Sequence, residues 1–165
     1  MQPTGEEPGY RVRAIGSTQL DARAGGGVSG SGEESAVPAT ILVVDDDDPV
    51  RVMLARLLRT QGYAVVQAAH ATEARQQLDS NRPDLVISDI VMPGDSGIEL
   101  RRSILERWPK LPVILISGYS SEGPAEFAAR TPNTLFVQKP FAADQFLALV
   151  QETLLAAGPE TSGSR

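Results

Sequence analysis

The chain has 165 residues, a formal net charge of −6 and no cysteine. This length is sufficient for one domain with a hydrophobic core, and the lack of cysteine excludes disulfide bonds and thiolate metal sites, as suits a reducing cytoplasm. The acidic balance argues against a nucleic-acid-binding surface, which needs clustered Lys and Arg, and no apolar run approaches the roughly 18 residues that span a bilayer. We therefore expect a cytoplasmic domain that binds neither nucleic acid nor membrane directly.

The two ends of the chain are predicted to lie outside the folded domain. Eight of the fifteen glycines fall within residues 1–39, which include the linker-like run GGGVSGSGEES. We expect this leader to be flexible or disordered, although YRVRAI at 10–15 could form a short strand. Residues 158–165 have the composition of a disordered tail. The predicted domain therefore covers residues 40–157.

Within this domain, short apolar runs alternate with amphipathic stretches. The run TILVVD at 40–45 is continuously apolar up to its carboxylate, as expected for a strand buried on both faces. Asp48 as the N-cap and Pro49 at the first helical position then predict a helix that ends at Gly62. The other predicted elements follow in chain order as strand 64–68, helix 71–78, strand 84–89, a helix from Ile98 that stops before Pro109, strand 111–117, helix 125–130, strand 134–138 and helix 143–156. This alternation predicts an α/β fold, a doubly wound five-stranded parallel sheet with helices on both faces.

Reactive side chains stand at the ends of four of the predicted strands. An acidic run that starts with Asp45 and Asp46 follows the first strand, and Asp89 ends the third. Ser117 ends the fourth strand, and Lys139 follows the fifth. The carboxyl ends of parallel strands form one rim, where ligands bind in open α/β sheets. We therefore expect carboxylates, a hydroxyl and an ammonium group to share one pocket.

Four sequence blocks resemble the signature blocks of the receiver domains of bacterial two-component response regulators. They read ILVVDDDDPVR, LVISDIVMPGDSG, VILISGY and FVQKPF, and they occur in the order and near the spacing of that family. The resemblance covers about residues 40–156. It implies a flavodoxin-like sheet with strand order 2-1-3-4-5, in a stand-alone regulator or a receiver derived from a hybrid kinase.

The resemblance also implies roles for individual residues. Asp89 is the implied phosphoacceptor, and the implied metal ligands are Asp45, Asp46, Asp89 and the backbone carbonyl of Val91. The implied catalytic groups besides Asp89 are Ser117 and Lys139. Ser117 is also the switch hydroxyl, and Phe136 is the switch aromatic residue. The implied metal is Mg²⁺ or Mn²⁺. Pro140 follows the lysine through a peptide bond that is usually cis in this family.

The function that the resemblance implies is signalling rather than turnover of an external substrate. A sensor histidine kinase or a histidine phosphotransfer protein would donate a phosphoryl group from phosphohistidine to Asp89 in a Mg²⁺-dependent step. The domain would catalyse its own phosphorylation and dephosphorylation, and would pass the signal to a downstream protein. The responding surface would comprise helix 125–130, strand 134–138 and helix 143–156, through which a homodimer is also conceivable.

Several of these residues have simpler interpretations. Asp47 and Asp48 are assigned to helix capping and to the favourable charge at a helix N-terminus. Phe136 is expected to be mainly a core residue, and His70, the only histidine, is expected to be an exposed loop residue. Asp89 is the hardest to explain structurally, because a carboxylate at the end of an apolar strand needs a charged partner.

Two other functions stay open from the sequence. In a phosphohydrolase of the haloacid-dehalogenase type, Asp45 and Asp47 would have the spacing of the nucleophile and the acid, but Asp89 would have no role. In a pseudo-receiver, the domain would bind partners without phosphorylation. The complete set of acidic, hydroxyl and ammonium groups argues against this third function.

The acyl phosphate is predicted to hydrolyse slowly. Val91 lies two residues beyond Asp89, and Tyr119 lies two residues beyond Ser117. Neither side chain offers an amide or a carboxylate that could orient a hydrolytic water. Loss of radiolabel from the isolated phosphoprotein should therefore take much longer than seconds, and decay within seconds would contradict the prediction.

Overall fold

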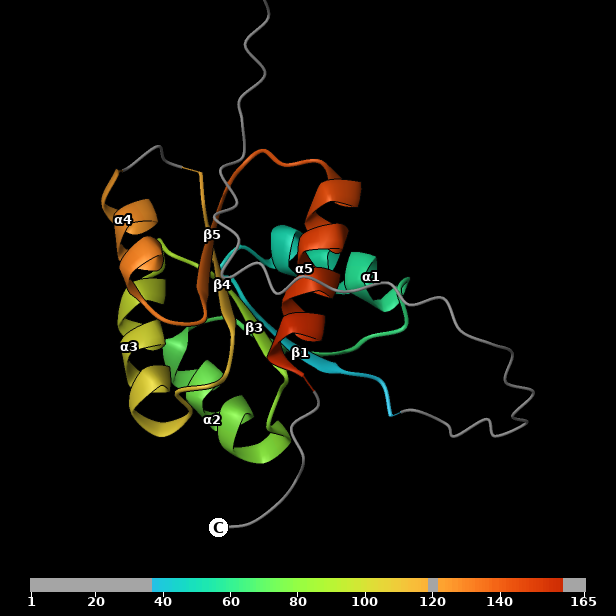
Figure 1. Cartoon of the computed structure of the whole chain (residues 1–165), viewed down its shortest axis with the longest axis horizontal. Helices are drawn as coiled ribbons and strands as arrows, with labels where there is room; N and C mark the ends of the chain where they lie inside the picture. The colour runs from blue at the N-terminus through green and yellow to red at the C-terminus, as the bar shows by residue number, and fades with distance from the viewer. Residues whose placement is uncertain (1–36, 119–121, 159–165) are drawn as a thin grey trace, which may run out of the picture. The chain divides into compact units, whose positions relative to one another are not determined.

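Five short apolar strands form one parallel sheet in the computed structural model, which describes residues 37–118 and 122–158. The strands are β1 (Thr40–Val44), β2 (Ala64–Ala68), β3 (Leu85–Asp89), β4 (Val113–Ser117) and β5 (Thr134–Gln138). The helices are α1 (Asp48–Arg59), α2 (Ala71–Asn81), α3 (Gly97–Arg107), α4 (Glu122–Arg130) and α5 (Ala143–Ala157). The strand order β2-β1-β3-β4-β5 confirms the predicted doubly wound, flavodoxin-like fold (Figure 1). The strand expected at 10–15 lies outside the described residues, and so does Tyr119.

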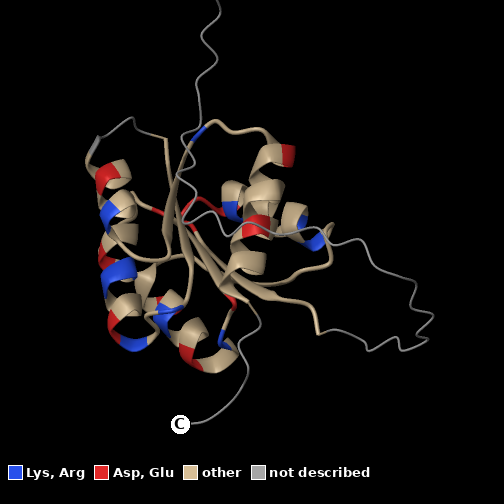
Figure 2. Cartoon of the chain, in the orientation of Figure 1, with Lys and Arg blue, Asp and Glu red and all other residues tan. Residues whose placement is uncertain are grey.

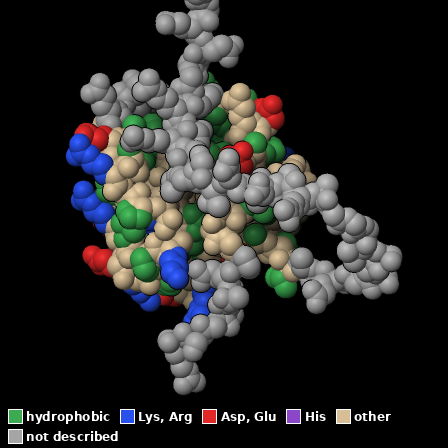
Figure 3. Space-filling model, in the orientation of Figure 1, with side chains coloured by type: hydrophobic (Ala, Val, Ile, Leu, Met, Phe, Trp, Pro, Cys, Tyr) green, Lys and Arg blue, Asp and Glu red, His purple; other side chains and the backbone are tan. Residues whose placement is uncertain are grey.

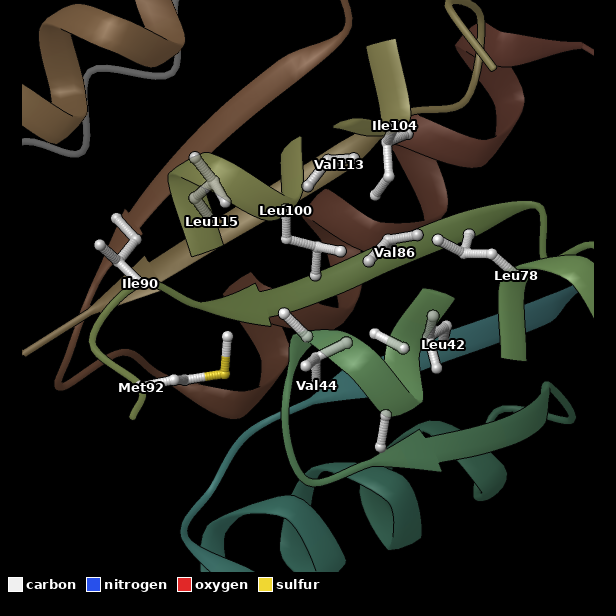
Figure 4. Close-up of a cluster of buried hydrophobic side chains, with 13 residues drawn as sticks. Leu42, Val44, Leu78, Val86, Ile90, Met92, Leu100, Ile104, Val113 and Leu115 are labelled. Carbon is white, nitrogen blue, oxygen red and sulfur yellow. The ribbon is translucent and has the colours of Figure 1, made fainter. Parts of the chain in front are cut away.

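The strands are buried on both faces because helices cover both. Successive side chains of a strand point to opposite faces, so Leu42 and Val44 enter one core cluster and Ile41 and Val43 enter another. The first cluster includes residues of α2 and α3 (Figure 4), and the second includes residues of α1 and α5. Figure 1 shows the same division, with α1 and α5 on one side of the sheet and α2, α3 and α4 on the other. This arrangement leaves the loops at the carboxyl ends of the strands as one rim.

The start of α1 differs by one residue from the prediction. The N-cap is Asp47, whose carboxylate accepts a hydrogen bond from the backbone N–H of Val50 at 3.4 Å. Asp48 is already helical, and the helix ends at Arg59 rather than at Gly62. The prediction was wrong because each aspartate of the run has a suitable side chain for capping, and only the path of the loop selects one of them.

The other helix boundaries also shift by a few residues. Helix α2 continues to Asn81, and its first turn is capped by His70, whose Nδ1 accepts from the N–H of Glu73 at 3.3 Å. His70 is exposed as expected, but it is also the N-cap residue at the start of α2. Helix α4 begins at Glu122, three residues before the predicted start. Among the described residues, no helix has both the length and the apolar character to cross a membrane.

One buried arginine was missed by the sequence analysis. Arg101 of α3 is fully buried, and its guanidinium donates to the hydroxyl of Thr134 at 2.7 Å and to the carbonyls of Leu111 at 2.9 Å and Pro132 at 2.6 Å. Burial lowers the pKa of Arg101 to about 10. The side chain thus joins α3 to the segments that lead into β4 and β5.

Replacing Arg101 with methionine should destabilise the fold. The change removes the donor of the Leu111 carbonyl and the charge-assisted bonds to Thr134 and Pro132, which keep only their mutual bond at 3.0 Å. A buried group left unsatisfied costs about 1–3 kcal/mol. We expect urea denaturation to show a loss of about 2–4 kcal/mol in the free energy of unfolding. Arg56→Met, at an exposed position of α1, is the control and should change stability by less than about 0.5 kcal/mol. Equal stabilities of the two variants would contradict a bridging role for Arg101.

Candidate functional site

Three carboxylates and one ammonium group meet at the carboxyl ends of the strands. Asp45, Asp46 and Asp89 each offer an oxygen atom, and these oxygens lie within 4.8 Å of one another. Lys139 Nζ lies 3.5 Å from Asp45 Oδ2 and 4.0 Å from Asp89 Oδ2. Ser117 ends β4 beside them and is buried, and its carbonyl accepts from the N–H of Lys139 at 2.8 Å. The structure therefore brings together the residues that the sequence placed on four separate strands.

The loop after β1 fixes the two acidic residues differently. Asp45 is only 2% exposed, and its Oδ1 accepts from the N–H of Asp47 at 2.9 Å while Oδ2 faces Lys139. Asp46 is exposed. Asp46 and Asp89 therefore have the more accessible oxygens, and Asp45 is held in place by its own loop and by the lysine.

The loop after β3 depends on a close backbone approach. The carbonyl of Ile90 accepts from the N–H of Gly97 at 2.9 Å. A Cβ atom at Gly97 would lie 2.2 Å from the carbonyl oxygen of Asp89, so only glycine fits against the backbone of this aspartate. Val91 is 56% exposed, and the N–H of Ile90 donates to the carbonyl of Ile116 at 3.0 Å. The turn at the start of α3 thus positions the end of β3.

Burial raises the pKa of the Asp89 carboxyl above its ordinary value of 3.8. The charge of Lys139 acts in the opposite direction, whereas the nearby Asp45 raises the pKa further. The N–H groups of the loop also favour the charged form. The result is a carboxylate whose negative charge is only partly compensated by its surroundings.

These donors fit a divalent cation. Three carboxylates face a single ammonium group, which leaves an excess of negative charge in a half-buried pocket. Carboxylate oxygens are the ligands that Mg²⁺ prefers, and it commonly binds through one or two of them together with waters. Several charges elsewhere on the described surface form opposite pairs, as in Arg75–Asp95, Arg107–Asp79 and Arg130–Glu126, and Figure 2 shows both signs interspersed along the helices.

The aromatic residue of β5 lies on one side of the sheet. Phe136 is half-buried and packs against the first core cluster, as does Phe127 of α4. The neighbouring Val137 faces the second cluster. The expected core position of Phe136 is therefore confirmed, and the Lys139–Pro140 peptide bond is cis, as the family resemblance implies.

Two arginines outside the pocket also contact the loops of the site, and the sequence analysis did not find them. Arg51 of α1 donates to the carbonyl of Asp45 at 2.7 Å. Arg75 of α2 pairs with Asp95 in the loop after β3 at 2.6 Å. For Arg51, the sequence shows only a basic residue near an acidic run. Neither contact can be predicted from the sequence, because both depend on the path of a loop.

The exposed surface shows no comparable gathering of groups in the view of Figure 3. On the part of this face that described residues form, hydrophobic side chains are scattered among charged and polar ones. Scattered apolar side chains are normal on a soluble domain.

Comparison with known proteins gives a consistent result. The family model described as "Response regulator receiver domain" matches residues 41–151. Response regulator MprA of Mycobacterium sp. (strain KMS) is 33% identical, over 75% of this chain and 54% of its own length. Sensor kinase CckA of Brucella abortus is 35% identical, over 70% of this chain and 12% of its own length. The chain thus spans about half or less of these two curated relatives.

A solved structure agrees over most of the described region. The response regulator receiver domain protein (CheY-like) of Methanospirillum hungatei has a TM-score of 0.70 and 26% identity. The match covers 73% of this chain and 97% of that one. The fold of residues around the acidic pocket is therefore a known receiver fold.

The raised pKa of Asp89 predicts a pH-dependent gain in stability for Asp89→Asn. A carboxyl whose pKa is higher in the folded state than in the unfolded state destabilises the fold while it is charged. Asp89→Asn should therefore unfold at higher urea concentration than the original protein at neutral pH. The difference should shrink as the pH falls through the raised pKa towards 3.8.

Asp144→Asn is a suitable control, because Asp144 is exposed, lies in the first turn of α5 and is not one of the three clustered carboxylates. It should give no gain in stability at any pH. An Asp89→Asn protein that is less stable than the original at neutral pH would contradict the electrostatic description of the pocket.

Proposed function

The chain belongs to the response regulator receiver domain family, a signalling domain of two-component systems, and we propose that it is switched by a phosphoryl group on Asp89. The donor would be the phosphohistidine of a sensor histidine kinase or of a histidine phosphotransfer protein. The observation that supports this most is the position of Asp89 in one pocket with Asp45, Asp46 and Lys139.

Charge is the main obstacle to the reaction. An Asp89 oxygen would form the new O–P bond while the N–P bond to the donor imidazole breaks, and the imidazole would take up a proton. Two unit negative charges 4 Å apart repel by roughly 4 kcal/mol at an effective dielectric of 20. Lys139, with Nζ 4.0 Å from Asp89 Oδ2, is placed to offset part of this repulsion and to hold a phosphoryl oxygen.

The acidic residues of the pocket would hold Mg²⁺ or Mn²⁺. The direct ligands would be Asp46, Asp89 and the carbonyl of Val91, with Asp45 acting largely through water. When bound, the ion supplies positive charge for the phosphoryl oxygens. Asp45 would at the same time keep Lys139 in place, because its Oδ2 lies 3.5 Å from Nζ.

The switch would follow from the hydroxyl of Ser117 and the ring of Phe136. A phosphoryl group adds charge and hydrogen-bond acceptors at Asp89, towards which the hydroxyl of Ser117 would move. The ring of Phe136 would respond, and the surface of α4, β5 and α5 would change for a downstream protein. The coupling needs to be only about 1–3 kcal/mol to shift the population of the active state.

The context of the domain is also a proposal. Similar receivers occur in the response regulator MprA and in the sensor kinase CckA, so a regulator and a receiver joined to a kinase are both compatible with the chain. In either context a cytoplasmic location suits the proposed donor. A homodimer through α4, β5 and α5 would be one way of using the same surface.

A small-molecule phosphodonor tests the proposal most simply. Incubation with acetyl phosphate and Mg²⁺ should add one phosphoryl group, as measured by intact mass, because the pocket would bind the ion and the donor phosphate together. Asp89→Asn should abolish the addition, since an amide is not a nucleophile for this step. Asp47→Asn is the matched control, because Asp47 caps α1, and it should retain the addition.

Each negative result has its own meaning. Absence of the mass increase in the original protein would favour the pseudo-receiver. Continuous hydrolysis of phosphomonoesters in a colorimetric assay would favour the phosphohydrolase. A mass increase that persists in Asp89→Asn would contradict the assignment of Asp89.

A further inference from the structure

Arg51 connects the two ends of the acidic run that follows β1. Its Nη1 donates to the carbonyl oxygen of Asp45 at 2.7 Å, and its Nη2 pairs with the carboxylate of Asp48. The side chain of Arg51 is only 14% exposed, so its guanidinium is largely withdrawn from solvent. These contacts reach from the first turn of α1 back across the loop to the end of β1.

The loop that Arg51 spans needs such a contact. It contains four consecutive carboxylates, from Asp45 to Asp48, which repel one another. Its other restraints include the hydrogen bond from the N–H of Asp47 to Asp45 Oδ1, the pair between Asp45 and Lys139, and the weak cap from Asp47 to Val50, which is 3.4 Å long. Arg51 adds a charge-assisted pair and a bond to a backbone carbonyl, which are stronger than neutral hydrogen bonds.

We propose that Arg51 is a positioning residue that holds the Asp45–Asp48 loop in its cation-binding geometry and so sets the affinity of the pocket for Mg²⁺. This inference rests on the proposed function, because it concerns the cation of the same site. Arg51 would not itself bind the ion or the phosphoryl group. It acts through the backbone of Asp45 and through the turn that presents Asp46.

A purely electrostatic effect of Arg51 would have the opposite sign. Arg51 is a positive charge near an acidic pocket, and its removal would by charge alone favour the binding of a cation. A positioning role predicts weaker binding after removal, because the ligands must then be ordered when the ion binds. The direction of the change in affinity therefore separates the two effects.

The test is the Mg²⁺ affinity of the unphosphorylated protein, measured by isothermal titration calorimetry. Arg51→Gln should raise the Kd for Mg²⁺ by about tenfold, at the lower end of the effects seen when groups that orient metal ligands are lost. Arg51→Lys keeps the charge but has one nitrogen in place of the two that make these contacts, and should give an intermediate loss. Arg56→Gln removes the same charge from an exposed position on α1 and should leave the affinity unchanged or slightly improved.

A second measurement follows the loop without any ion. Hydrogen exchange of the Asp47 amide, which donates to Asp45 Oδ1, should be faster in Arg51→Gln than in Arg56→Gln. Equal affinities and equal exchange in the two glutamine variants would overturn the proposal. If Arg51→Gln does not fold, an unchanged affinity in Arg51→Lys would overturn it. An original protein that takes up no Mg²⁺ would overturn both this inference and the proposed function, which distinguishes that failure from one confined to Arg51.

Discussion

The structure of this domain depends on an imbalance of charge at one end of its sheet. Three carboxylates and one ammonium group lie at the carboxyl ends of β1, β3 and β5, partly removed from water. Like charges at this spacing are unfavourable unless a cation joins them, and the pKa of Asp89 is raised by burial and also by the nearby Asp45. The excess negative charge of the pocket is therefore compatible with a bound cation.

The rest of the fold maintains this arrangement. Two core clusters fix the strands from both faces, so the strand ends cannot move independently. Gly97 lets α3 start against the backbone of Asp89, and Arg51 and Arg75 attach the loops after β1 and β3 to neighbouring helices. At the opposite end of the sheet, Arg101 joins α3 to the segments before β4 and β5. Polar contacts between helices and loops thus support both ends of the sheet, with one set at the pocket and Arg101 at the opposite end.

Much of this could be predicted from the sequence. Continuous apolar runs located all five strands, and their alternation with amphipathic stretches gave the parallel sheet and hence the common rim for Asp45, Asp89 and Lys139. Apolar periodicity says less about polar side chains. It could not choose between Asp47 and Asp48 as the cap of α1, because both have the required carboxylate.

It also could not show that Arg101 is buried. The partners of Arg101 are carbonyls and a hydroxyl from segments 10 to 33 residues away, and no local pattern encodes such contacts.

The most direct test of the central claim is to follow the side-chain carboxyl carbons of the aspartates by NMR during a Mg²⁺ titration. If the pocket is one cation site, the signals of Asp45, Asp46 and Asp89 should shift together along a single saturation curve, while that of the exposed Asp144 stays unchanged. Signals that do not shift, or that shift with unrelated affinities, would contradict a shared site.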